Sequence, residues 1–118
     1  MVVDTAQAAG RTDRLFHALA DATRRDIVLR TMQKEHSVSA LADLYPMSFA
    51  AVQKHVAVLE RAELVTKERR GRQQLVRGNV GAVRNATRLL EQFETVWRHR
   101  VDQMDHILTE ATTEGLDP

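Results

Sequence analysis

One internal stretch, residues 37–77, constrains the fold of this 118-residue chain more than any other part. It holds a short apolar run, then Pro46, then a longer amphipathic run and two strand-like runs. Proline ends helices because it lacks an amide hydrogen and its ring clashes with the preceding turn. We therefore expect a short helix over residues 40–44, capped by Ser37 or Ser39, and a turn at Pro46.

A second helix is expected over about residues 48–61, with Ser48 as its N-cap. Val52, Val56 and Leu59 fall on one side of it at helical spacing, so this side should pack on the core. The opposite side presents small and polar residues: Ala50, Gln53, Lys54 and Ala57.

After this helix the pattern changes to that of two short strands, at residues 64–67 and 74–77. Between them lies the basic sequence Arg69-Arg70-Gly71-Arg72, in which Gly71 can adopt the positive φ of a tight turn. We expect a β-hairpin over about residues 64–77 with a cationic tip.

The rest of the chain favours helices, so the predicted fold class is mainly α with a small β-hairpin. Residues 1–11 are small and polar and are expected to form a flexible N-terminus, followed by a single domain over residues 12–113. A last helix is expected over about residues 80–113. Its apolar residues step by three and four, which favours a seam between helices: Leu90, Phe93, Trp97, Val101, Met104 and Leu108.

Composition narrows the function. The chain has no cysteine, which excludes disulfides and thiolate metal sites. We see no export signal and no membrane span, and expect a cytoplasmic protein. No phosphate-binding loop or paired nucleophile and base points to an enzyme. The net charge is only +1, yet residues 48–88 contain nine basic and three acidic side chains. This basic region could face phosphates.

The order of the elements favours DNA as the partner. A helix such as the one over 48–61 fits the major groove and enters it with its N-terminal turn. Ala50 is small enough for close approach, and the Gln53 amide can form two hydrogen bonds with adenine. Lys54 can reach guanine or a phosphate, whereas His55 leaves two interpretations open: a phosphate contact or a bond to neighbouring polar groups. The hairpin tip can reach the DNA backbone or a minor groove.

Several segments, in this order and spacing, resemble the ArsR family of bacterial repressors: Ala18–Ile27, Val38–Ala42, Met47–Leu59, Leu64-Val65 and Gly71-Arg72. The resemblance implies a dimeric winged helix-turn-helix repressor that binds an imperfect palindrome, often in its own promoter. It also implies that the terminal helices, with the apolar residues of the last one, form the homodimer interface. The expected contacts with double-stranded DNA are Ser48, Phe49, Ala50, Gln53, Lys54, His55, Lys67, Arg69, Arg70 and Arg72.

The chain departs from the family pattern in two places. Glu63 stands where many relatives have glycine, so a left-handed backbone there would be strained. The cysteine metal box of metal-sensing members is missing, and we expect a metal-independent protein without a cofactor.

Two alternatives remain open. Zinc could bind between subunits through residues of the last helix: His99, Asp102, His106 and Glu110. The chain could also be a protein-interaction module, in which the basic hairpin is incidental.

Overall fold

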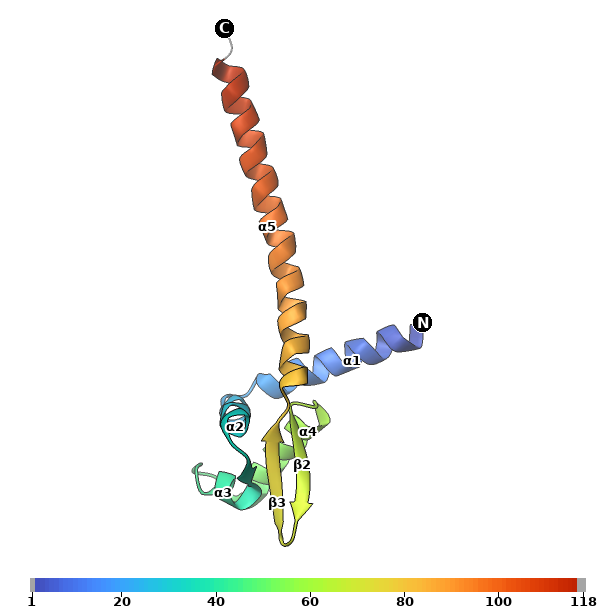
Figure 1. The fold of residues 1–118 in the computed structure, drawn as a ribbon, viewed down its shortest axis with the longest axis vertical. Coiled ribbons are helices and arrows are strands. Elements are labelled where there is room, and N and C mark those ends of the chain that lie inside the picture. Colours follow the sequence, from blue (N-terminus) through green and yellow to red (C-terminus); the bar gives the residue numbers. More distant parts are fainter. Residues whose placement is uncertain (1, 117–118) are drawn as a thin grey trace. The chain divides into compact units, whose positions relative to one another are not determined.

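A computed structural model describes residues 2–116 of the chain, which divides into two compact units, residues 1–86 and residues 87–118. The elements in chain order are α1 (Val2–Leu19), α2 (Ala22–Gln33), β1 (His36–Ser37), α3 (Val38–Ala42), α4 (Phe49–Arg61), β2 (Val65–Arg70), β3 (Gln73–Gly78) and α5 (Val80–Leu116) (Figure 1). Helix α5 begins in the first unit and makes up the second. The prediction of a mainly α fold with a β-hairpin is confirmed.

The sheet has three antiparallel strands in the order β1-β3-β2. The β2–β3 hairpin, here called the wing (residues 65–78), turns at Gly71, whose φ of 64° is the positive value expected there. The third strand, β1, was not predicted. It pairs with β3 through His36 opposite Val76 and Ser37 opposite Leu75, and so ties the wing to the end of α2.

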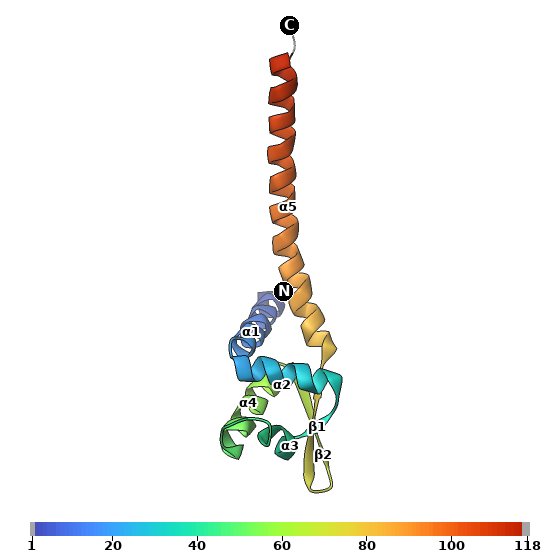
Figure 2. The same ribbon diagram turned by 90° about the vertical axis from the view of Figure 1, so that its left-hand side faces the viewer.

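The core of the first unit lies among α1 to α4 and the sheet. Ile27, Leu41, Leu59 and Val76 come from four different elements and are all fully buried. Helices α3 and α4 contact the strands of the wing, and Figure 2 shows the hairpin extending beside them. One continuous core therefore fixes the helix-turn-helix and the wing against each other.

Three expected ranges can be compared with the elements of the structure. Residues 2–11, expected to be flexible, belong to α1, because their alanine-rich sequence favours a helix without offering an apolar stripe. The single domain expected over 12–113 stays a prediction; within the structure, contacts group residues 1–86 and residues 87–118 as two compact units. Helix α3 starts two residues early because Ser37 caps it through a bond from the Ala40 amide to its hydroxyl, 3.0 Å long.

The second unit is one helical stretch with a largely exposed surface. The apolar side chains predicted to form an interface are at least half exposed, except Val101, which is partly buried. Val96 and Ile107 add to this apolar surface and were not predicted. None of the described helices is both long enough and apolar enough to cross a lipid bilayer.

Candidate nucleic-acid interface

The N-terminal turn of α4 is built to face outward. The Ser48 hydroxyl accepts a hydrogen bond from the Ala51 amide at 3.1 Å and caps the helix as predicted. Val52, Val56 and Leu59 are buried, so packing fixes the rotation of the helix. The opposite side leaves five of the predicted DNA contacts exposed: Ser48, Phe49, Ala50, Gln53 and Lys54.

The turn that precedes α4 is held to α2 by a shared carboxylate. The Tyr45 hydroxyl donates to Asp26 Oδ2 at 2.5 Å, and Arg30 Nε donates to the same oxygen at 2.7 Å. These donors, Tyr45 foremost, lower the pKa of Asp26. Burial and the bond to Asp26 together raise the pKa of Tyr45 to about 12. The Tyr45 hydroxyl therefore links the turn before α4 to α2.

His55 lies on the inner flank of α4, away from the exposed surface. Its Nδ1 is 3.3 Å from Arg24 Nη1 and 3.9 Å from Asp21 Oδ2, and its side chain is only 21% exposed. Arg24 also donates to the main-chain oxygens of His17 and Ala18 at the end of α1. The structure thus favours the second interpretation of His55, a bond to neighbouring polar groups.

Helix α4 ends in a Schellman motif. The Leu64 amide donates to Leu59 O at 3.0 Å, and the Glu63 amide donates to Glu60 O at 2.9 Å. Glu63 has a φ of 62°, the left-handed value expected if glycine is usual there. Leu59 and Leu64, the apolar pair that accompanies this motif, are both fully buried.

Asn79 joins the end of α4 to the start of α5. Its side-chain Nδ2 donates to Glu63 O at 2.8 Å, and its Oδ1 accepts from the Gly81 amide at 3.1 Å. Its own amide donates to Leu64 O at 2.9 Å. The same residue therefore caps α5 and satisfies two carbonyls at the end of α4.

The basic side chains of the wing have different surroundings. Lys67 Nζ lies 3.6 Å from Glu60 Oε1 on α4, which neutralises it locally. Arg70 is held between two carboxylates, 3.3 Å from Glu35 and 3.1 Å from Glu68. Among the described residues of the chain, no carboxylate forms an ion pair with Arg69 or Arg72. Of the wing cations predicted to contact DNA, these two are the most available.

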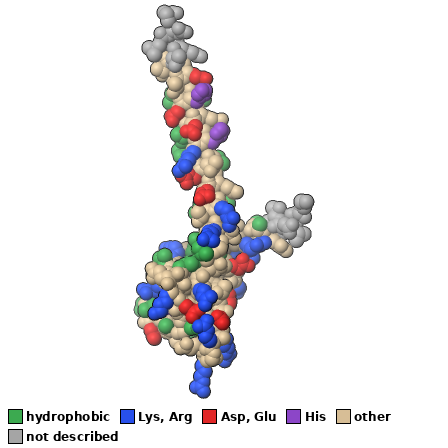
Figure 3. Space-filling view, viewed as in Figure 1, with side chains coloured by type: hydrophobic (Ala, Val, Ile, Leu, Met, Phe, Trp, Pro, Cys, Tyr) green, Lys and Arg blue, Asp and Glu red, His purple; other side chains and the backbone are tan. Residues whose placement is uncertain are grey.

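Arg69 and Arg72 border a hollow of about 230 Å³ between α3, α4 and the wing. Gln53 and Phe49 lie on its α4 side, and other polar residues complete its lining: Ser39, Gln73 and Gln74. Figure 3 shows basic side chains at the hairpin end of the first unit. Gln53 and the two arginines, predicted separately from the sequence, therefore come together at one concave surface.

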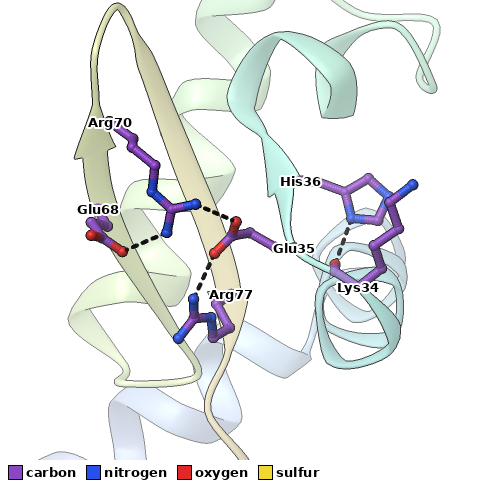
Figure 4. A network of polar contacts seen from close by, with 6 residues as sticks. All are labelled: Lys34, Glu35, His36, Glu68, Arg70 and Arg77. Atoms are coloured by element: carbon purple, nitrogen blue, oxygen red, sulfur yellow. Dashed lines mark hydrogen bonds and ion pairs between the residues drawn. The ribbon is translucent and has the colours of Figure 1, made fainter.

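Sequence reasoning missed Glu35, because an acidic residue after a helix resembles any solvated loop residue. Figure 4 shows its carboxylate between Arg70 and Arg77 of the wing. It also missed Gln73, Gln74 and Ser39, which only the folded hairpin and the position of α3 bring to the hollow.

The predicted zinc ligands are not gathered. His106 Nε2 and Glu110 Oε1 are 2.9 Å apart, one helical turn from each other, and His99 and Asp102 are exposed. In the part of the chain that the structure describes, no three His, Cys, Asp or Glu residues are placed to hold a metal ion.

Known proteins give a consistent comparison. No protein-family model matches the chain. An HTH-type transcriptional regulator, Rv2034 of Mycobacterium tuberculosis, is 47% identical to this chain over 53 residues. The matched region covers 45% of this chain and 50% of that relative's length.

Solved structures match over more of the chain. An ArsR-like transcriptional regulator from Rhodococcus sp. RHA1 has a TM-score of 0.74 and 28% identity, over 84% of this chain and 93% of that one. The homodimeric winged helix-turn-helix DNA-binding domain of Mb0332 from Mycobacterium bovis has a TM-score of 0.63 and 25% identity, over 75% of this chain and 84% of that one. The chain therefore has the winged helix-turn-helix fold and is similar, in structure and in sequence, to ArsR-type transcriptional regulators.

Proposed function

We propose that this protein is a sequence-specific DNA-binding transcriptional repressor. The observation that carries the proposal is the concave surface on which Gln53 of α4 adjoins Arg69 and Arg72 of the wing. A glutamine amide can contact a base in the major groove, while guanidinium groups bind phosphates beside it. The exposed Ser48 to Ala50 turn lets the helix approach the groove closely.

The DNA-bound form would be a homodimer. Most apolar residues of α5 from Leu90 to Leu108 are exposed in the single chain, and a stripe of this length needs a partner helix. Mb0332, a structural relative, is homodimeric. Two recognition helices in successive major grooves would require half-sites about 10 base pairs apart, centre to centre. The proposed target is such an imperfect palindrome, with the protein's own promoter as the first to test.

Fluorescence anisotropy with the upstream region and a scrambled duplex tests this proposal. We expect tight binding to the first, weak binding to the second, and a steep loss of affinity with salt as phosphate contacts release counterions. Equal, weak binding to both duplexes would refute sequence specificity and favour the interaction-module alternative.

A matched pair of variants tests the role of Gln53. Gln53→Ala should cost about 1 to 3 kcal/mol on the cognate duplex and little on the scrambled one. Gln33→Ala is the control, because this exposed glutamine ends α2 and does not border the hollow. Equal losses on both duplexes for Gln53→Ala would show that it contacts no base.

The repressor is proposed to act without metal. The same titration with chelator and then with zinc should give one binding curve. Release of the DNA by zinc would instead support the site on α5, and His106→Ala would then abolish the zinc response.

A further inference from the structure

Two neighbouring arginines of the wing face different surroundings. Side chains alternate between the two faces of a strand, so Arg69 and Arg70 of β2 point to opposite sides. Arg69 borders the hollow next to Gln53. Arg70 lies on the other face, in a chain of ion pairs that runs from Arg77 through Glu35 and Arg70 to Glu68 (Figure 4).

Glu35 is the centre of this chain. Its Oε2 accepts from Arg77 Nη2 at 2.7 Å and its Oε1 accepts from Arg70 Nη1 at 3.3 Å. Its side chain is 27% exposed, against 62% for Glu68, so Glu35 is the more firmly held of the two acids. The adjacent guanidinium groups, Arg77 foremost, lower the pKa of Glu35, which therefore stays ionised at neutral pH.

The backbone places Glu35 where it must meet the wing. It lies between the C-cap of α2 and strand β1, and β1 is hydrogen-bonded to β3 with His36 opposite Val76. The carboxylate is thus carried on the same sheet as the arginines that it binds. Two carboxylates and two guanidinium groups leave this face of the wing without net charge, whereas Arg69 and Arg72 keep their charge beside the hollow.

We propose that Glu35 is a positioning residue that withholds Arg70 from DNA phosphate, so that the wing binds DNA through Arg69 and Arg72. The Glu35 carboxylate binds the guanidinium group of Arg70 as a phosphate oxygen would. A DNA phosphate therefore has to displace this carboxylate before it can bind Arg70. Glu35 thereby weakens the part of DNA binding that does not depend on sequence. The contacts made by α4 then supply a larger share of the affinity. This inference rests on the proposed DNA-binding function.

The salt dependence of DNA binding tests it. The slope of log K against log salt changes by about 0.9 for each phosphate contact. Glu35→Gln keeps the shape of residue 35 and removes its charge, so Arg70 of each subunit becomes available. The variant dimer should lose roughly 12-fold more affinity than the wild type between 50 and 200 mM salt. It should also bind the scrambled duplex more tightly at low salt.

Arginine variants identify the responsible side chain. In the wild-type background Arg70→Gln should leave the slope unchanged, whereas Arg69→Gln should reduce it by about 0.9 per subunit. The double variant Glu35→Gln, Arg70→Gln should return to the wild-type slope. Glu68→Gln, which leaves the Glu35 bond to Arg70 in place, is the matched control and should change the slope less than Glu35→Gln. A purely structural role of Glu35 would alter the melting temperature but not this pattern.

Two results would overturn the inference while the proposed function stands: an unchanged slope for Glu35→Gln, or a loss for Arg70→Gln as large as that for Arg69→Gln in the wild-type background. Failure of the wild type to bind any duplex would instead refute the proposed function itself.

Discussion

Replacing Glu63 by glycine should stabilise the protein. Glu63 has a φ of 62° at the end of α4, and a left-handed backbone costs an L-residue about 1 to 2 kcal/mol relative to glycine. Glycine loses more backbone entropy on folding, which offsets roughly 0.5 to 1 kcal/mol of this gain. The net increase in the free energy of unfolding should be about 0.5 to 1 kcal/mol, or about 2 to 4 °C in melting temperature.

Urea denaturation followed by circular dichroism measures this effect. The midpoint should rise by about 0.25 to 0.5 M with an unchanged slope. The protein concentration must be the same for all variants, because a dimer is more stable at higher concentration. Asn79 Nδ2 donates its hydrogen bond to the main-chain oxygen of Glu63, so replacing the Glu63 side chain leaves this bond intact.

Glu63→Ala is the control that separates the effect of the backbone conformation from the effect of the carboxylate charge. It removes the carboxylate but keeps the left-handed cost, so it should give no comparable gain. Equal stabilisation by alanine and glycine would show that the charge was responsible. A glycine variant less stable than the wild type would refute the assignment of strain at this residue.

Three further variants probe other parts of the molecule. Trp97→Ala should weaken dimerisation, because it removes the largest side chain of the exposed stripe on α5; an unchanged dimer mass at low concentration in analytical ultracentrifugation would contradict this. Tyr45→Phe should lower the free energy of unfolding by about 1 kcal/mol. The pKa of Tyr45 is about 12 in the folded protein, above the ordinary value of 10. The contribution of Tyr45 to the free energy of unfolding is therefore complete below pH 10 and is lost as the pH rises through 12. Denaturation at pH 8 and at pH 11.5 should show this loss in the wild type and not in the variant. Gly78→Ala should destabilise by roughly 1 to 3 kcal/mol, since its Cβ would lie 2.7 Å from Met32 Sδ and 2.9 Å from Met32 N; an unchanged melting temperature would refute this packing argument.

The sequence predicted well those features that local chemistry determines. Ser48 as a cap, Pro46 as a helix breaker and Gly71 as a turn residue each act over a few neighbouring residues, and the structure has all three in these places. The left-handed backbone expected at Glu63 is also local in origin, because a Schellman motif depends on five or six consecutive residues.

Features that depend on tertiary contacts escaped prediction. Strand β1 is two polar residues long, and only its pairing with β3 makes it a strand. Glu35 meets Arg77 across 42 positions of sequence, and no local pattern indicates such a pair. Leu44 falls within the helix expected over residues 40–44, yet it is 44% exposed, because α3 ends at Ala42 and no longer carries it toward the core.

Asn79 imposes an unusual restriction on how this sequence can vary. Its Nδ2 donates to Glu63 O, and its Oδ1 accepts from the Gly81 amide. Both bonds come from one short side chain. Aspartate would set a second oxygen against the Glu63 carbonyl, serine would be too short, and glutamine would be too long by one carbon. In a library of all single substitutions, residue 79 should accept almost no replacement, while exposed neighbours such as Val80 tolerate many. Related sequences should therefore keep this asparagine even where the exposed residues on either side of it differ.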